Sequence, residues 1–167
     1  MIRLKYLDLV KQIFSYCAKY KLKICTAESC TGGLLSAYFT YIPGSSKFFN
    51  KGLICYTNEA KIDLLHVPKA VLDHYGAVSF ETVMLMAQNN SKSQDNYISI
   101  ATTGMLGPDS KNSLKSAGLV YIAINIGNNK LDVKKFLLSG DRHKIQNYVI
   151  EQALLYTINN LKSLFDK

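Results

Sequence analysis

Apolar residues recur at two spacings along the chain, and each spacing predicts one kind of element. Residues 5–20 and 142–163 carry apolar side chains three and four positions apart, which indicates amphipathic helices at both ends of the chain. Short runs rich in β-branched residues predict five strands, over residues 22–26, 52–56, 97–103, 119–126 and 130–138. Capping and turn residues delimit four further helices, over 34–41, 58–65, 68–76 and 80–91.

The predicted elements alternate between helix and strand before three consecutive strands and a last helix. Such alternation favours an α/β fold, here a single three-layer α/β/α sandwich. The sequence Gly127-Asn128-Asn129 is a hairpin signal between the last two strands. We therefore expect a mixed, mostly parallel sheet of about five strands. Because no repeat or low-complexity linker interrupts the pattern, one domain is expected over residues 1–167.

Composition narrows the protein class. The 167 residues are 48% hydrophobic, which suits a globular domain that needs neither disulfides nor a metal to fold. No apolar run is long enough to cross a bilayer, and the N-terminus lacks the apolar core of a signal peptide. Among the four cysteines there is no C-x-x-C pair or zinc-like spacing. We expect a cytoplasmic protein with reduced thiols, no metal site, no cofactor and no membrane association.

The formal net charge is +8, which raises the question of nucleic acid binding. The 20 lysines and arginines are spread along the whole chain, and no nucleic-acid-binding motif is present. A basic surface that attracts a small anionic substrate is therefore favoured, and nucleic acid is an unlikely partner. Long apolar helices on a small domain favour a homo-oligomer.

The stretch Glu28-Ser29-Cys30-Thr31-Gly32-Gly33 is the first candidate for chemistry. A strand ends there and a helix begins, so backbone N–H groups are exposed that can stabilise an oxyanion or hold a phosphate. Ser29 would lie beside them as a nucleophile. Taken alone, the stretch is also typical of a helix cap with glycines for a tight turn, and that structural interpretation is the commoner one.

A serine nucleophile needs a base, and the sequence offers Tyr56 and Lys61 close together. Tyr56 is expected to end a strand, and Lys61 lies one turn into the next helix. Lysine can act as the base once burial lowers its pKa, and tyrosine can relay the proton. No histidine occupies a position that suggests pairing with a nucleophile. A solvated helix lysine is the alternative interpretation of Lys61.

Two further loops lie where ligands gather in α/β proteins, at strand ends and helix starts. Thr103 and Gly104 follow a predicted strand and could line a crevice. Arg142 begins the last helix and could hold a phosphate, although Asp141 as an ordinary helix cap explains that sequence equally well.

These places occur together in one order, and the chain resembles the CinA C-terminal-domain family, which includes nicotinamide-mononucleotide deamidases. The likeness covers nearly the whole chain. The motifs that carry it are T-A-E-S-C-T-G-G at 26–33, P-G-S-S-K-F-F at 43–49, G-L-I-C-Y-T-N-E-A-K at 52–61, L-L-H-V at 64–67, G-A-V-S at 76–79, T-G-M-L-G-P-D at 103–109, G-L-V-Y-I-A at 118–123 and G-D-R at 140–142. The E-S-C-T-G-G block together with Y-x-N-x-x-K is specific, whereas G-A-V-S or G-D-R alone is a weak signal.

The resemblance implies hydrolysis of the carboxamide of nicotinamide mononucleotide to nicotinic acid mononucleotide and ammonia. It puts the nucleophile on Ser29, with assistance from Tyr56 and Lys61. Substrate binding would fall to Cys30, Thr31, Gly32, Gly33, Ser46, Thr103, Gly104 and Arg142. The chain departs from the family pattern at Met105, Leu106, Ser116 and Gln146.

Other interpretations stay open on the sequence alone. Cys30 is a rival nucleophile, since thiolates attack well and it lies at the same helix start. The substrate could be another small amide. A protein of a different class, a non-catalytic nucleotide-binding module or an interaction module connected with competence or DNA damage, is the remaining alternative.

Overall fold

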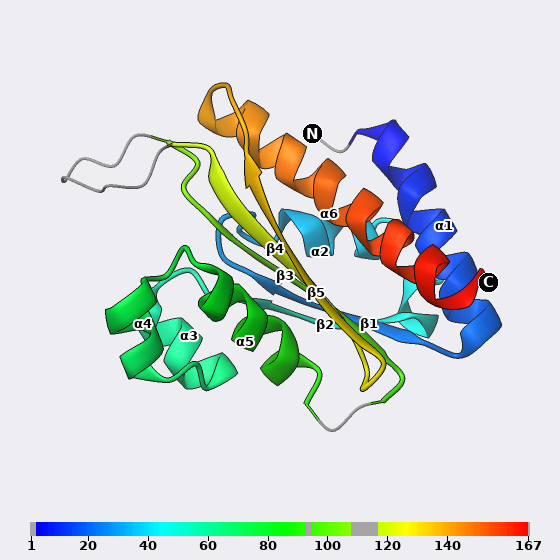
Figure 1. The fold of residues 1–167 in the computed structure, drawn as a ribbon. Coiled ribbons are helices and arrows are strands. Elements are labelled where there is room, and N and C mark those ends of the chain that lie inside the picture. The colour runs from blue at the N-terminus through cyan, green and yellow to red at the C-terminus, as the bar shows by residue number, and fades with distance from the viewer. Residues whose placement is uncertain (1–2, 93–94, 108–116, 167) are drawn as a thin grey trace.

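The computed structural model describes residues 3–92, 95–107 and 117–166, and Figure 1 shows the fold. The elements are α1 (Leu4–Tyr20), β1 (Lys23–Glu28), α2 (Leu34–Thr40), the 3-10 helix η1 (Ser45–Lys47), β2 (Phe49–Ile54), α3 (Asn58–Leu65), α4 (Lys69–Tyr75), α5 (Phe80–Asn90), β3 (Tyr97–Gly104), β4 (Leu119–Ile126), β5 (Lys130–Leu137) and α6 (Arg142–Phe165). Apart from η1, this is the order that the hydrophobic pattern predicts.

The five strands form one sheet in the order β2-β1-β3-β4-β5. β1 pairs in parallel with both β2 and β3, whereas β4 is antiparallel to β3 and to β5. Four of the five strands therefore run in the same direction, which confirms the mixed, mostly parallel sheet. Because β1 and β3 are central and parallel, their carboxyl ends meet at one edge of the sheet.

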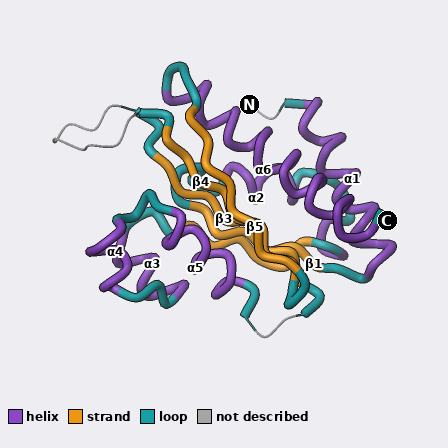
Figure 2. The backbone as a smooth tube through the Cα atoms, viewed as in Figure 1, coloured by secondary structure: helices purple, strands orange, loops and turns teal. Residues whose placement is uncertain are grey.

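Helices cover both faces of the sheet, with α1, α2 and α6 on one side and α3, α4 and α5 on the other (Figure 2). Alternation along the strands gives the two faces different side chains. Isoleucines such as Ile98, Ile100 and Ile122 pack under α1 and α6. The opposite face presents Ala101 and Ala123, small side chains that let α5 lie close to the sheet. The three-layer sandwich is confirmed.

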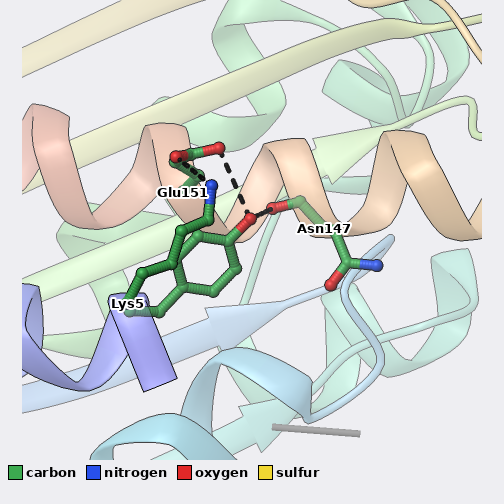
Figure 3. Close-up of polar contacts among 4 residues, drawn as sticks. Lys5, Asn147 and Glu151 are labelled. Atoms are coloured by element: carbon green, nitrogen blue, oxygen red, sulfur yellow. Dashed lines mark hydrogen bonds and ion pairs between the residues drawn. The ribbon is translucent and has the colours of Figure 1, made fainter. Parts of the chain in front are cut away.

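α1 and α6 pack together on one face of the sheet, joined at their rims by polar contacts. Lys5 forms an ion pair with Glu151 at 2.9 Å (Figure 3). The buried Tyr6 also places its hydroxyl 3.3 Å from the Asn147 carbonyl oxygen. An exposed ion pair contributes less than about 1 kcal/mol. The association of α1 with α6 therefore depends on buried apolar side chains such as Val10.

The predicted position of the second strand is wrong. β2 begins at Phe49 and ends at Ile54, so Tyr56 lies in the loop before α3 instead of ending the strand. β2 is an edge strand whose middle residues are exposed, and it therefore lacks the apolar pattern of a buried strand. The helix predicted over residues 58–65 matches α3, and Thr57 caps it although Asn58 is also a residue type that favours helix caps.

Candidate functional site

Ser29 directly follows β1 at the carboxyl edge of the sheet. Its N–H donates to the Thr102 carbonyl at 3.0 Å, so pairing with β3 continues one residue past the strand and fixes the backbone of Ser29. The chain then turns into α2 through Gly32 and Gly33, whose φ values of 61° and 93° favour glycine. Ser29 is thereby held at the tip of a central strand with 8% of its surface exposed.

The Glu28 carboxylate, which the sequence prediction missed, caps the start of α2. It is fully buried and accepts N–H bonds from Gly33 at 3.0 Å, Leu35 at 3.0 Å and Ser36 at 2.8 Å, together with the hydroxyl of Ser36. These N–H groups are the ones that a bound anion would use at a helix start. The first turn of α2 is therefore satisfied internally, and the Gly33 N–H is not open to a ligand.

Lys61 reaches Ser29 from the first turn of α3. Thr57 caps this helix by accepting from the Ala60 N–H at 3.1 Å, which sets the direction of the helix toward β1. Helical side chains lean toward the helix N-terminus, so Lys61 folds back over the cap. Its Nζ lies 3.1 Å from Oγ of Ser29, and only 1% of the residue is exposed.

Three backbone carbonyls surround the Lys61 amine. Nζ lies 2.9 Å from the oxygen of Cys55, 3.3 Å from that of Tyr56 and 3.4 Å from that of Thr57. A neutral amine has two N–H donors and one lone pair, so it can donate to two of these oxygens and still accept from the Ser29 hydroxyl.

Burial lowers the pKa of Lys61 below its ordinary value of 10.5, because the charged ammonium loses its water; nearby Cys55, Cys30 and Glu59 oppose the shift. The position of the amine near the positive end of the α3 dipole also disfavours a cation. The neutral amine that can accept a proton is therefore more populated than in an exposed lysine. The alternative interpretation of Lys61, a solvated helix lysine, is therefore wrong.

The side chain of Tyr56 points to a different partner. Its phenol oxygen accepts from Nη2 of Arg142 at 3.1 Å, whereas its contact with Lys61 is made by the backbone carbonyl. The residue is 59% exposed, as suits the rim of a site. The structure thus joins the α3 loop to the start of α6 through this pair.

A pocket of about 550 Å³ opens above Ser29 and Lys61. Seven of the eleven predicted site residues line it, namely Ser29, Cys30, Tyr56, Lys61, Thr103, Gly104 and Arg142. The other lining residues are Ala77, Val78, Met105, Leu106 and Gly107, which supply an apolar wall. Ala77 and Val78 follow α4 within the G-A-V-S motif at 76–79, but neither is among the predicted site residues.

The other four predicted residues, Thr31, Gly32, Gly33 and Ser46, are outside the pocket lining. Thr31 is buried and its hydroxyl bonds that of Thr102 at 2.9 Å. Gly32 and Gly33 shape the turn behind Ser29, and Ser46 is exposed in η1. Thr31, Gly32 and Gly33 therefore shape the turn behind Ser29, whereas η1 with Ser46 lies by the start of β1, at the other end of that strand. We propose no substrate contact for the side chains of these four residues.

Thr103 and Gly104 line the pocket and also stabilise the fold around it. The Thr103 hydroxyl donates to the Ala77 carbonyl at 2.7 Å and so ties the wall that follows α4 to β3. A Cβ on Gly104 would lie 2.6 Å from the Val120 side chain and 3.0 Å from the Leu119 carbonyl oxygen. Only glycine therefore lets β3 and β4 approach at that point.

The residues at which the chain departs from the family pattern do not all lie in the pocket. Met105 and Leu106 line the pocket, and Gln146 contacts the backbone behind Ser29. Ser116 lies outside the described residues.

A second groove of about 530 Å³ lies at the opposite end of the sheet, beside the β4–β5 turn. Amide side chains dominate its lining, among them Gln88, Asn125 and Asn129. Among the described lining residues the one hydroxyl, on Ser91, accepts from the Asn125 side chain at 2.9 Å. These described residues include no buried amine beside a hydroxyl, in contrast to the pocket over Ser29.

Cys30 is a poor nucleophile in this setting. It is buried, and desolvation raises the pKa of its thiol to about 12, so the reactive thiolate is scarce near neutral pH. All four cysteines are free and buried. Within residues 3–92, 95–107 and 117–166 no three histidine, cysteine or acidic side chains gather as a metal site would require, and no helix there is long and apolar enough to cross a membrane.

Solved structures with the same architecture are described as CinA superfamily or competence/damage inducible proteins. The crystal structure of a competence-damaged protein (CinA) superfamily protein from Enterobacter cloacae matches with a TM-score of 0.87 and 31% identity, over 93% of this chain and 92% of that one. The competence/damage inducible protein CihA from Agrobacterium tumefaciens also matches with a TM-score of 0.87 and 31% identity, over 95% and 98% of the two chains.

Sequence comparison leads to the same group. A CinA-like protein from Dictyoglomus thermophilum is 42% identical over 147 residues, which are 88% of this chain and 36% of that protein. The chain spans about a third of the length of the curated relatives it matches. Residues 7–161 match the family described as the CinA C-terminal domain. The chain therefore belongs to the CinA family, and it corresponds to the C-terminal domain of that family.

Proposed function

We propose that this domain hydrolyses the carboxamide of nicotinamide mononucleotide, giving nicotinic acid mononucleotide and ammonia. The observation that carries the proposal is the buried pair of Ser29 and Lys61, whose Oγ and Nζ atoms lie 3.1 Å apart in the wall of a pocket. A hydroxyl beside a lysine of lowered pKa is the arrangement that Ser-Lys hydrolases use.

In the acylation step, Oγ of Ser29 attacks the carboxamide carbon while its proton passes to the neutral Nζ of Lys61. The tetrahedral intermediate then breaks its C–N bond, and the departing nitrogen takes the proton back from Lys61 and leaves as ammonia. The enzyme retains an ester between Ser29 and the pyridine carbonyl. The positive charge of the pyridinium ring makes the carboxamide carbon more electrophilic, which helps a serine nucleophile.

Water completes the reaction by the reverse path. Lys61, neutral again, takes a proton from water as the oxygen attacks the ester carbon. The bond from that carbon to Oγ breaks, Ser29 recovers the proton from Lys61, and the carboxylic acid product leaves and releases its own proton to solvent as it becomes the carboxylate. Each step uses the same two side chains, so no other titratable group is needed for the proton balance.

The oxyanion of each intermediate needs donors close to Ser29. Among the described residues, the N–H groups of Cys30 and Thr31 have no protein acceptor, whereas those of Gly32 and Gly33 donate to the Ser29 carbonyl and to Glu28. We assign the oxyanion to the first two groups. Removing one such donor costs roughly a hundredfold to a thousandfold in rate in a known hydrolase.

The remaining pocket suits a nucleotide with an aromatic base. Its volume of about 550 Å³ lies within the roughly 300–1,000 Å³ of small-molecule sites. Val78, Met105 and Leu106 offer an apolar surface for the pyridine ring. The Arg142 guanidinium at the rim can exchange its contact with Tyr56 for the phosphate, which accepts two bonds from it. Tyr56 would then be a rim residue that orders Arg142, with its carbonyl holding Lys61.

Ammonia release tests the proposal. Wild-type protein should release ammonia from nicotinamide mononucleotide, and more slowly from nicotinamide riboside, which lacks the phosphate. Arg142→Ala should reduce this preference by raising KM for the mononucleotide alone. If the protein hydrolyses a different small amide but not nicotinamide mononucleotide, the same chemistry acts on another substrate. Binding of the mononucleotide without ammonia release would favour a non-catalytic module.

A further inference from the structure

Gln146, on the second turn of α6, contacts the backbone behind the proposed nucleophile. Its Nε2 lies 3.2 Å from the Thr31 carbonyl oxygen and 3.4 Å from that of Cys30. Cys30 lines the pocket, but Gln146 does not, so the glutamine approaches the turn from its far side. The side chain therefore acts on the shape of the turn without touching a ligand in the pocket.

The rest of this turn is tied down by other groups. The Ser29 N–H donates to Thr102, the Ser29 carbonyl accepts from Gly32, and the Gly33 N–H donates to Glu28. Among the described residues, the Cys30 carbonyl has no donor other than Gln146. The Thr31 carbonyl also accepts from the Leu34 N–H at 3.1 Å, so the peptide between Cys30 and Thr31 is the unit of the turn whose orientation depends most on α6.

The orientation of that peptide decides where its N–H points. A trans peptide is planar, with its C=O and N–H directed to opposite sides. With the Cys30 carbonyl held toward Gln146, the Thr31 N–H is directed away from α6. An oxyanion donor must be held within about half an ångström of its working position to be effective.

We infer that Gln146 is a positioning residue, which fixes the Cys30–Thr31 peptide so that its N–H can stabilise the oxyanion. The inference rests on the proposed serine-based hydrolysis but not on the identity of the amide. Because Gln146 acts through this peptide, its loss lowers the rate of the chemical step and leaves substrate binding largely unchanged.

Steady-state ammonia release from nicotinamide mononucleotide gives the first test. Gln146→Glu keeps the shape of the side chain but presents a carboxylate to two carbonyls, so kcat should fall about tenfold or more with KM within about twofold. Gln146→Lys, which restores N–H donors, should recover most of the loss. Gln152→Glu makes the same chemical change on the same helix and should leave both constants unchanged. Gln146→Met replaces the glutamate variant if that variant does not fold.

Labelling of Ser29 with a fluorophosphonate, followed by mass spectrometry, gives a second readout that needs no natural substrate. Wild-type and Gln152→Glu proteins should label at the same rate, and Gln146→Glu should label about tenfold more slowly. Wild-type labelling without ammonia release would refute the mononucleotide as substrate, and the labelling rates would still decide the role of Gln146.

Three results would overturn the inference. The first is equal rates for Gln146→Glu and wild type in both assays, and the second is a loss of activity that appears in KM alone. The third is a loss of kcat that Gln146→Lys does not recover while the thermal midpoint of the variants falls in parallel with kcat. Absence of labelling at Ser29 in the wild type would overturn both this inference and the serine mechanism.

Discussion

At the scale of single residues, the protonation of Lys61 governs what the site can do. The amine is enclosed by three carbonyl oxygens and the Ser29 hydroxyl, and burial lowers its pKa. Only the neutral form can accept the Ser29 proton. The local fold of α3, which turns the lysine back over its own helix start, therefore decides the reactivity of a serine on another element.

The pH dependence of turnover follows from this arrangement. Because Lys61 must be neutral, kcat/KM for ammonia release should rise with pH along a limb whose midpoint lies below 10.5, the ordinary lysine pKa. A pH–rate profile of the wild type on nicotinamide mononucleotide measures this midpoint. A limb that follows an unshifted lysine would contradict the assignment of Lys61 as the base.

The neighbouring Cys30 should be dispensable as a nucleophile. Burial raises the pKa of its thiol to about 12, so little thiolate is present near neutral pH. Cys30→Ala should keep kcat/KM for ammonia release within an order of magnitude of the wild type, since only its backbone N–H serves the reaction. Inactivation as complete as that of a nucleophile variant, in a folded protein, would transfer the chemistry to the thiol.

At the scale of elements, the site is made by two helix starts that meet at the ends of β1 and β3. α2 begins behind Ser29, where Glu28 accepts its free N–H groups, and α3 begins beside it with Lys61 in the first turn. The buried carboxylate keeps the α2 start closed to anions, so open donors are confined to the turn immediately after Ser29.

The contribution of Glu28 can be measured by chemical unfolding. Glu28→Gln replaces an acceptor of four hydrogen bonds by an amide that cannot accept them all, so the free energy of unfolding should fall by about 1–3 kcal/mol. Glu59→Gln, on the exposed first turn of α3, is the matched control and should change it by about 0.5 kcal/mol or less. Equal changes in the free energy of unfolding for the two substitutions would show that the Glu28 cap stabilises the protein no more than an exposed glutamate does.

The elements themselves could largely be predicted from the sequence, because the buried helices and the central strands carry clear apolar periods. β2 was misplaced because an edge strand depends on hydrogen bonds to β1 more than on its own side chains. The contact between Ser29 and Lys61 could be expected only from the family resemblance, because 32 residues separate the two along the chain and a single lysine is usually solvated. The roles of Glu28 and Gln146 depend on contacts between backbone and side chain that leave no periodic pattern.

At the scale of the whole molecule, burial of apolar side chains stabilises the fold, whereas burial of Lys61 lowers the free energy of unfolding. Two apolar cores enclose the sheet, and Lys61 is a buried ionisable amine beside one of them. Below the folded-state pKa of Lys61 both folded and unfolded chains bind its proton, and the burial penalty is present in full. Between that pKa and about 10.4 only the unfolded chain binds it, so this penalty shrinks as pH rises.

The same reasoning predicts a pH-dependent difference between two proteins. Lys61→Met should be more stable relative to wild type at neutral pH than at high pH, because raising the pH relieves the wild type alone. Urea unfolding of both proteins over a pH series measures the difference in free energy. A difference that stays constant up to the ordinary lysine pKa would show that burial does not shift Lys61.

The central claim is that the Ser29 hydroxyl attacks the amide, and the rate of ammonia release by Ser29→Ala tests it most directly. With nicotinamide mononucleotide as substrate, the account predicts a loss of kcat of at least about a thousandfold with the thermal midpoint preserved. Ser15→Ala, an exposed serine on α1, should match the wild type. Ammonia release by Ser29→Ala at the wild-type rate would contradict the account.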